Sequence, residues 1–265
     1  MQIILDEKYS CERSVVALGM FDGVHLGHRV LLERGAALAR QRKAPLVVCT
    51  FQAHPLAVIA PDHCPPSLTT FAERCALMEA LGVDVLCAMP FTPETMNMLP
   101  EEYVGQLVRR FHPTDVVCGY NHTFGRKGQG TPALLNALGA ALGFTTSIVP
   151  KITLEHADVS STVIRGLLRK GDVDDARAML KRPYKLTAMV EGQDGEGRCA
   201  LCLTDEGKQR VASGSYRAVL QQGEHRWPIQ LHTSEGDHML CHLPCELQVG
   251  EPVALFFWTN LSIDF

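Results

Sequence analysis

A segment rich in glycine and histidine, residues 19–28, joins an apolar run to the start of a helical pattern. It reads Gly-Met-Phe-Asp-Gly-Val-His-Leu-Gly-His and directly follows the apolar residues 14–18. A strand that ends at such a junction exposes the first amides of the next helix, and these amides are suited to bind phosphate. The glycines let a ligand approach the backbone, and the imidazoles of His25 and His28 can reach the same oxyanions. The segment therefore predicts a triphosphate site.

The composition of the chain argues against several classes of protein. The chain has 265 residues, 46% of them hydrophobic, and a net charge of −4. This hydrophobic content is enough for a packed core, and the scattered basic residues argue against a nucleic-acid groove or a membrane surface as partner. The start, residues 1–8, is too soon interrupted by charge for a signal peptide, and no apolar run approaches the roughly 18 residues of a membrane span. We expect a cytoplasmic protein with reduced cysteines that acts on small molecules.

Short apolar runs alternate with helical patterns from residue 14 to about residue 150. This alternation predicts an α/β fold, a doubly wound parallel sheet with helices on both faces. Thr131 followed by Pro132 is typical of a helix start, and Gly143 of a helix end. The expected strands are 14–20, 45–51, 83–89, 114–118 and 144–149, and the expected helices are 28–41, 70–81, 100–111 and 131–142.

The character of the sequence changes near Pro183. Two short helices, 161–170 and 172–181, precede this proline, and the remainder shows short strand-like runs separated by Gly, Asp and Glu turns. Such a pattern predicts a small all-β, barrel-like domain. We therefore expect two domains, residues 1–183 and residues 184–265. The strand-like runs are 185–191, 199–204, 215–220, 227–232, 238–243 and 252–258.

Three further motifs follow the histidine pair in order. The four motifs are Phe21–His28, Thr50–Pro55, Gly119–Gly125 and Ser160–Arg165. The first resembles the HxGH signature of the nucleotidylyltransferase superfamily, and the ordered set resembles the adenylyltransferase half of the bacterial bifunctional riboflavin kinase/FAD synthetases. The resemblance covers roughly residues 14–184 and implies FMN adenylyltransferase activity, in which ATP and FMN give FAD and pyrophosphate. Mg²⁺ would enter with ATP, held by phosphates and water.

The resemblance implies a role for each matching residue. The catalytic residues would be His25, His28, Asn121, Ser161 and Arg165. The ATP-binding residues would be Gly19, Phe21, Asp22, Gly23, His25, Gly27, His28, Ser160, Ser161, Thr162 and Arg165. The FMN-binding residues would be Phe51, His54, Pro55, Asn121 and Phe124.

Two of these segments also have a physical interpretation of their own. The serines and threonine at 160–162 begin a helix, and Arg165 lies one turn further on, an arrangement suited to a second anion site. Asn121 follows a strand at the carboxyl edge of the sheet, where doubly wound folds place ligands. The family commonly shows Asp-Phe-Arg-Phe or Asn-Phe-x-Phe here, whereas this chain has His122 in place of the first aromatic residue.

The C-terminal part departs from the family pattern. Riboflavin kinase domains of the family carry a glycine-rich segment that runs into Pro-Thr-Ala-Asn and use a downstream glutamate as base. The comparable stretch here, residues 190–202, has neither feature. This departure from the family pattern predicts that riboflavin kinase activity is absent and that this domain is a degenerate kinase-like barrel.

Cysteines and histidines in this second domain raise the question of structural zinc. They are Cys199, Cys202, Cys241, Cys245, His232, His238 and His242. Because residues three apart on a strand point to opposite faces, Cys199 and Cys202 do not form a tight zinc pair. The sequence favours buried thiols over a zinc site, and whether Cys199, Cys202, Cys241 and Cys245 bind a metal stays open.

Two other functions remain open on sequence grounds. The same fold could adenylylate another phosphorylated acceptor, or the protein could be a non-catalytic flavin or nucleotide sensor. The expected partners are ATP and FMN, with no nucleic acid and no membrane, and the oligomeric state is not predicted.

Overall fold

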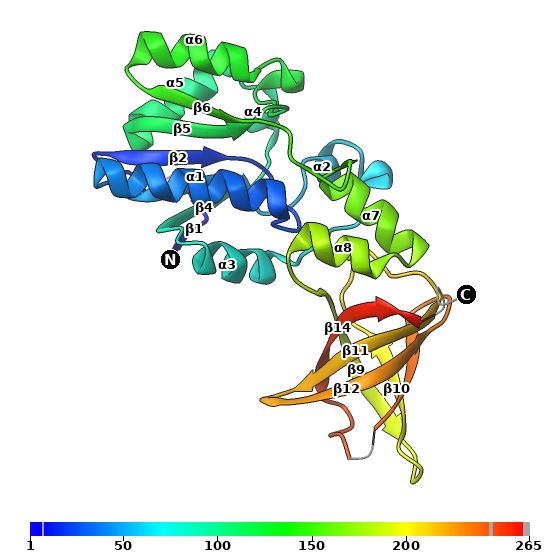
Figure 1. Ribbon diagram of the computed structural model, residues 1–265. Coiled ribbons are helices and arrows are strands. Elements are labelled where there is room, and N and C mark those ends of the chain that lie inside the picture. The colour runs from blue at the N-terminus through cyan, green and yellow to red at the C-terminus, as the bar shows by residue number, and fades with distance from the viewer. Residues whose placement is uncertain (7, 244–245, 262–265) are drawn as a thin grey trace. The chain divides into compact units, whose positions relative to one another are not determined.

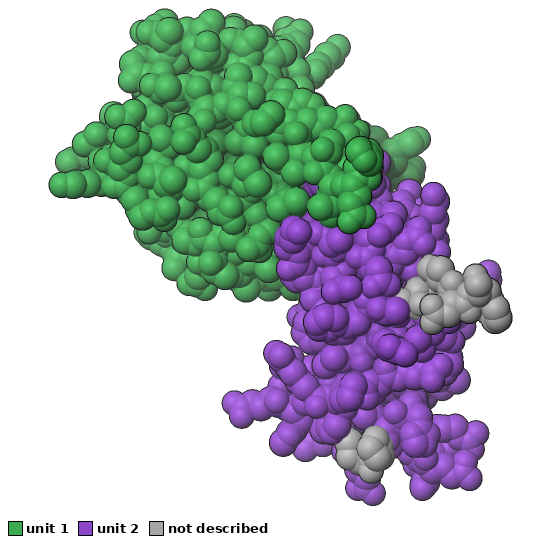
Figure 2. All heavy atoms as spheres, viewed as in Figure 1, with its two compact units in different colours: residues 1–65, 71–158 green, residues 66–70, 159–265 purple. Residues whose placement is uncertain are grey.

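A computed structural model describes residues 1–6, 8–243 and 246–261 (Figure 1). The chain divides into two compact units, coloured separately in Figure 2. The first comprises Met1–Pro65 and Phe71–Asp158, and the second comprises Pro66–Thr70 and Val159–Phe265. The two helices before Pro183 thus group with the second unit. The predicted division into domains of residues 1–183 and 184–265 stays a prediction.

The first unit contains a six-stranded sheet in the order β1-β4-β3-β2-β5-β6. All five pairs of neighbouring strands are parallel. Helices lie on both faces of this sheet, so the predicted doubly wound α/β fold is confirmed. The strands are β1 (Gln2–Ile4), β2 (Ser14–Leu18), β3 (Leu46–Phe51), β4 (Val85–Met89), β5 (Pro113–Gly119) and β6 (Thr145–Val149).

The central strand β2 shows how one apolar run supports two helical layers. Val15 and Ala17 pack in one core cluster with residues of α1 and α3, whereas Val16 and Leu18 pack in another with residues of α5 and α6. Successive side chains of a strand point to opposite faces, so an uninterrupted apolar run is what a strand covered on both sides requires. The covering helices are α1 (Leu26–Arg42), α3 (Phe71–Ala80), α5 (Pro100–Phe111) and α6 (Pro132–Leu142).

The residues expected to begin and end the helix over 131–142 cap α6 in the structure. Thr131 Oγ1 accepts a hydrogen bond from the Leu134 amide, 3.2 Å away, and Gly143 ends α6 in the left-handed conformation. These contacts satisfy amides and carbonyls that a helix end leaves unpaired. Shorter elements that the sequence did not predict complete the unit: α2 (Leu56–Ile59), η1 (Pro61–His63), α4 (Pro93–Asn97), η2 (Arg126–Gly128), β7 (Thr153–Leu154) and β8 (Ala157–Asp158).

The second unit contains a closed antiparallel barrel in the order β10-β13-β12-β11-β14-β9. Buried and more exposed residues alternate along β9, from Tyr184 at its start to the exposed Glu191. The inward positions form an apolar interior, and the predicted all-β barrel is confirmed. The strands are β9 (Tyr184–Gln193), β10 (Arg198–Leu203), β11 (Gly214–Gln222), β12 (His225–Thr233), β13 (His238–His242) and β14 (Pro252–Asn260).

Two helices and a short segment accompany this barrel. The helices are α7 (Ser161–Lys170) and α8 (Val173–Leu180). The Ser67 amide donates to the Gly207 carbonyl and the Gln209 amide to the Ser67 carbonyl, both at 2.8 Å. These bonds explain why residues 66–70 belong to this unit. In the described part of the chain, no helix combines the length and apolar character needed to cross a membrane.

Candidate active site

Three of the four sequence motifs follow neighbouring strands of the parallel sheet. The strands β3 and β5 lie on either side of β2, and the chain runs outward from β2 through β3 to β4 before it returns to β5. The direction of winding therefore reverses between β2 and β5. At such a switch point the loops after the two strands diverge, and doubly wound folds bind ligands in the crevice between them.

The loop between β2 and α1 has an unusual backbone. Phe21 and Val24 have φ angles of 56° and 39°, and the Val24 amide donates to the Phe21 carbonyl at 3.1 Å. Side chains other than glycine rarely adopt positive φ, and a β-branched residue such as valine is especially disfavoured there. Both side chains are fully buried, so packing holds the loop in this conformation. Strain of this kind clusters at functional sites.

His25 and His28 lie against each other at the start of α1. Their ring centroids are 3.7 Å apart with an interplanar angle of 17°. His25 is the N-cap of the helix, and its Nδ1 accepts a hydrogen bond from the His28 amide at 3.4 Å. Burial, the adjacent His25 and the nearby Arg74 charge lower the pKa of His28 well below 6.5. Its Nδ1 is buried and has no hydrogen-bond partner among the described residues. His28 is therefore neutral at pH 7 and retains an unused polar atom.

Arg74, a residue that the sequence interpretation missed, joins the first two motifs. Its guanidinium donates to the carbonyls of Met20, Phe51 and Gln52 at 2.9, 2.8 and 2.7 Å. The side chain is only 5% exposed. These bonds hold the loop after β2 to the loop after β3. The available signal was its place in the helical pattern, since Arg74 lies four residues before the buried Met78 and so on the apolar face of α3.

The segment after β3 contains predicted flavin contacts. Phe51 packs edge-to-face on Phe91, with centroids 5.1 Å apart and an interplanar angle of 87°. His54 Nδ1 accepts a hydrogen bond from the Leu56 amide at 3.1 Å, and Pro55 is the N-cap of α2. Phe91, in the loop after β4, was not predicted from the sequence. An aromatic pair of this kind can pack against a planar ligand.

The segment after β5 presents an exposed amide close in sequence to a buried aromatic ring. Asn121 is exposed, two residues beyond the end of β5. Phe124 is 6% exposed, with the His122 ring 5.7 Å and the Tyr103 ring 5.5 Å from its own. Burial lowers the pKa of His122 to about 4. In this conformation Phe124 supports the loop from within the core, and its predicted contact with flavin stays a prediction.

The fourth motif lies at the start of α7. Ser160 is the N-cap, and its Oγ accepts a hydrogen bond from the Val163 amide at 3.2 Å. Ser161 and Thr162 are the first two residues of the helix. Arg165 is 6% exposed, and its Nε donates to the Pro66 carbonyl at 2.6 Å. These residues belong to the second unit, whereas the histidines and Asn121 belong to the first.

Comparisons with known proteins show which family this chain resembles. A family model described as FAD synthetase matches residues 7–163. The bifunctional riboflavin kinase/FMN adenylyltransferase of Bacillus subtilis is 33% identical over 188 residues, 70% of this chain and 59% of that protein. The corresponding Escherichia coli K12 protein is 28% identical, over 71% of this chain and 60% of that protein. A FAD synthetase of Listeria monocytogenes is 28% identical, over 76% of this chain and 82% of that protein.

The chain thus spans about three fifths of the length of these bifunctional relatives. Among solved structures, a macrolide-efflux protein from Streptococcus pneumoniae matches with a TM-score of 0.87 and 24% identity, over 98% of this chain and 90% of that chain. That likeness shows the fold alone. The family-model match covers more than half of the chain and contains the first three motifs completely. On these grounds the chain belongs to the FAD synthetase family.

Proposed function

We propose that this chain is an FMN adenylyltransferase, which transfers AMP from ATP to FMN and releases pyrophosphate. The observation that carries the proposal is the stacked pair of His25 and His28 at the start of α1, beside the switch point of the sheet. Imidazoles next to unpaired helix amides are suited to a polyphosphate. The comparisons support the choice of substrates, because several relatives are named riboflavin kinase/FMN adenylyltransferases.

The transfer needs positioning rather than a covalent nucleophile. A phosphate oxygen of FMN attacks the α-phosphorus of ATP, a new P–O bond forms, and the bond from the α-phosphorus to the bridging oxygen breaks, so that pyrophosphate leaves with the electron pair. Groups that neutralise charge on the transferring phosphoryl group and on pyrophosphate lower the barrier. In our proposal His25 and His28 contact the triphosphate. In the second unit, Ser161, Arg165 and the helix amides that follow Ser160 form an anion-binding group of their own, which suits the phosphates that leave.

Binding of ATP changes the charge state of His28. Burial keeps the imidazole neutral, since its pKa is lowered well below 6.5. A triphosphate brings negative charge close to the ring, and an opposite charge raises the pKa of a base. His28 then carries a proton when the phosphates are present, and this positive charge stabilises the transition state for adenylyl transfer.

The flavin side of the proposed site follows the second and third motifs. Phe51 and the His54-Pro55 turn supply an apolar wall, and Phe51 is held by Phe91. Asn121 is exposed and offers both a donor and an acceptor between the two substrates. Arg74 holds the loops of the first two motifs together and so acts as a positioning residue.

Mg²⁺ would arrive with ATP. In the segment 19–28 the sole carboxylate is Asp22, which is 8% exposed. Mg²⁺ prefers several oxygen ligands and keeps much of its water, so the donors present fit a cation held chiefly by the phosphates. The cation would neutralise charge on the β- and γ-phosphates.

We further propose that the barrel has no riboflavin kinase activity. The turn between β9 and β10 is closed by its own charged groups: the Asp194 carboxylate accepts from the Arg198 amide at 2.8 Å and from Arg198 Nε at 2.9 Å. The stretch 190–202 contains no threonine and no asparagine to organise a metal and phosphates. Purified protein supplied with riboflavin, ATP and Mg²⁺ should form no FMN; formation of FMN as fast as FMN is adenylylated contradicts this part of the proposal.

A direct assay tests the adenylyl transfer. The full chain is incubated with FMN, ATP and Mg²⁺, the flavins are separated by chromatography, and pyrophosphate is measured. We expect equal amounts of FAD and pyrophosphate, and full activity in a control in which the exposed His63 is replaced by alanine. Adenylylation of another phosphorylated acceptor but not of FMN would refute the proposed substrate. Binding of ATP and FMN without pyrophosphate would indicate a sensor instead.

A further inference from the structure

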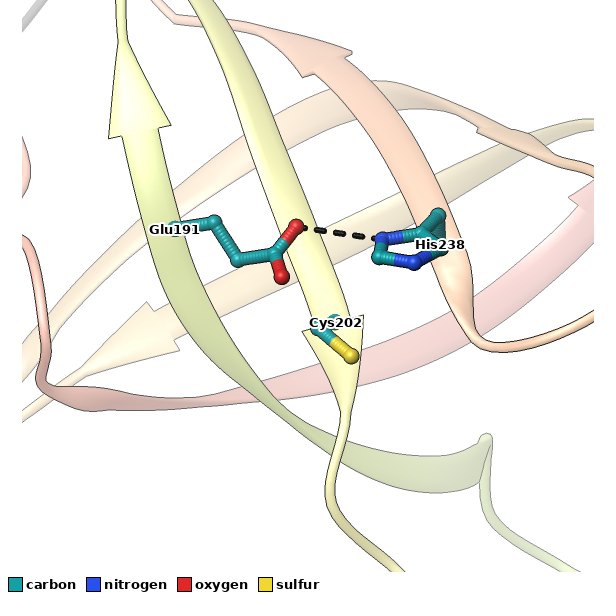
Figure 3. A group of neighbouring side chains, drawn as sticks. All are labelled: Glu191, Cys202 and His238. Carbon is teal, nitrogen blue, oxygen red and sulfur yellow. Dashed lines mark hydrogen bonds and ion pairs between the residues drawn. The ribbon is translucent and has the colours of Figure 1, made fainter.

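Three side chains with different ligand chemistry converge on the outside of the barrel (Figure 3). They are Glu191 on β9, Cys202 on β10 and His238 on β13. Glu191 Oε2 lies 3.1 Å from His238 Nδ1. One ligand atom of each residue lies within 4.8 Å of the others, and this is the single such group of three among the described residues.

Strand register explains the convergence. Cys202 is directly opposite His238 in the antiparallel pair of β10 and β13. On the other side of β10 the register shifts, so that Gly192 pairs with Ala200 and Val190 with Leu201, which leaves Glu191 as the bulged residue between them. A bulge re-aims the side chain of its extra residue and is common next to functional sites. Here it directs the Glu191 carboxylate toward the other two side chains.

The same register separates these residues from the inward cysteines. Cys199 and Cys241 are direct cross-strand partners and both are buried. The hydrogen bond that Cys241 donates to Cys199, together with burial, raises the pKa of the Cys241 thiol. His232, on β12, is hydrogen-bonded through Nδ1 to Ser215 Oγ on β11 at 2.8 Å. The seven residues grouped by sequence therefore do not form one set, and Cys245 lies outside the described residues.

We propose that Glu191, Cys202 and His238 form a binding site for a borderline-soft divalent cation, with Zn²⁺ as the ion it fits best. Thiolate, imidazole and carboxylate are the ligands that Zn²⁺ takes in proteins, at about 2.3, 2.0 and 2.0 Å. Tetrahedral coordination at these lengths places ligand atoms roughly 3.3 to 3.6 Å apart. The ligand atoms of the three residues already lie within 4.8 Å of one another, so rotation of these side chains at the barrel surface is enough to reach that spacing.

Charge and protons balance in this proposal. Zn²⁺ displaces the proton of the Cys202 thiol, which passes to solvent, and the cation replaces the hydrogen bond between Glu191 and His238. Thiolate and carboxylate together neutralise the two positive charges. Three protein ligands leave one position for water or for a ligand from another molecule. The bound ion links β9, β10 and β13 and so stabilises the barrel without involvement of the adenylyltransferase motifs.

Zinc titration of the full chain tests the proposal. Protein freed of metal is titrated with Zn²⁺ against a chromogenic chelator, and we expect one equivalent to bind. Cys202→Ser and His238→Ala should each weaken binding by more than about 100-fold, beyond what loss of a group that merely supports a metal ligand costs. Added Zn²⁺ should raise the Tm reported by the fluorescence of Trp227 and Trp258, both in the barrel.

Matched variants give the controls. Cys64→Ser removes a partly exposed thiol elsewhere, and His242→Ala removes an exposed imidazole of the same strand, so both should bind Zn²⁺ as the unchanged protein does. Co²⁺ should give a thiolate charge-transfer band that is lost in Cys202→Ser and retained in Cys64→Ser. Absence of stoichiometric binding overturns the proposal. Undiminished binding in Cys202→Ser or His238→Ala, or binding that is lost instead in His28→Ala, overturns it as well.

Discussion

Replacement of His122 by phenylalanine should change how the stability of the first unit depends on pH. The His122 side chain packs against Phe124, its Nε2 is buried without a hydrogen-bond partner among the described residues, and burial lowers its pKa to about 4. Phenylalanine has a similar ring and no titrating group. The substitution also restores the aromatic residue that is common in the family at this position.

The size of the effect follows from the shift in pKa. An unfolded histidine has a pKa near 6.5, so between pH 6.5 and pH 4 the unfolded chain binds a proton at His122 that the folded chain does not. The contribution of the neutral His122 to the free energy of unfolding is fully present above pH 6.5 and is lost as pH falls toward 4. A difference of about 2.5 pKa units corresponds to about 3 kcal/mol in the free energy of unfolding. The His122→Phe protein should not show this loss.

Hydrogen exchange of amides in the central strands β2 and β5 measures the stability of this unit separately from the barrel. The two proteins are compared at each pH between 7 and 4, which cancels the intrinsic pH dependence of exchange. A difference in the free energy of unfolding between the two proteins that is the same at every pH reports packing. Only a difference that changes with pH reports titration of His122. A His63→Phe control should follow the unchanged protein, because solvent reaches this exposed ring. Parallel curves for His122→Phe and the unchanged protein would refute a buried neutral imidazole.

Three further predictions concern the proposed reaction. Arg74→Met leaves three loop carbonyls without a donor, so it should reduce the free energy of unfolding by about 3 kcal/mol and weaken the binding of both substrates. Denaturation and KM values measure the two effects, and Arg40→Met, at an exposed position, should show neither. His28→Ala should lower kcat by on the order of 10² to 10³ and abolish proton uptake on ATP binding at pH 7, measured by calorimetry in two buffers; unchanged uptake contradicts the proposed protonation. Asn121→Ala should raise KM for both substrates, and near-normal kinetics would make this amide structural.

The layers of the fold were predictable because strong local patterns determine them. The helices expected over 100–111 and 161–170 have these bounds in the structure, since proline, serine and glycine mark their ends. The strand β1 was missed because an edge strand of three residues carries almost no periodic signal. The short helix α2 and the β7–β8 hairpin were missed for the same reason.

The site could be predicted only in part. Spacing on one helix start was sufficient to place His25 beside His28, because residues three apart on a helix are neighbours. Contacts between segments far apart in the sequence could not be predicted from local patterns. Examples are the hydrogen bond from Arg74 to Met20 and the packing of Phe91 against Phe51. The outward group around Cys202 was missed because it depends on a bulge, which shifts the pairing of one strand against the next.

The positions of unfavourable features argue for function at the edge of the sheet where β2, β3 and β5 end. Several non-glycine residues with positive φ have a structural reason, since Lys43 and His112 end helices in the left-handed conformation. Phe21 and Val24 end no helix and lie in the loop of the first motif. The same edge holds the buried Arg74 guanidinium and the neutral His28 imidazole, polar groups whose removal from water costs free energy that their contacts must offset. A fold under selection for stability alone has no reason to collect these features beside the helix start that carries His25 and His28, whereas the triphosphate site that we propose does.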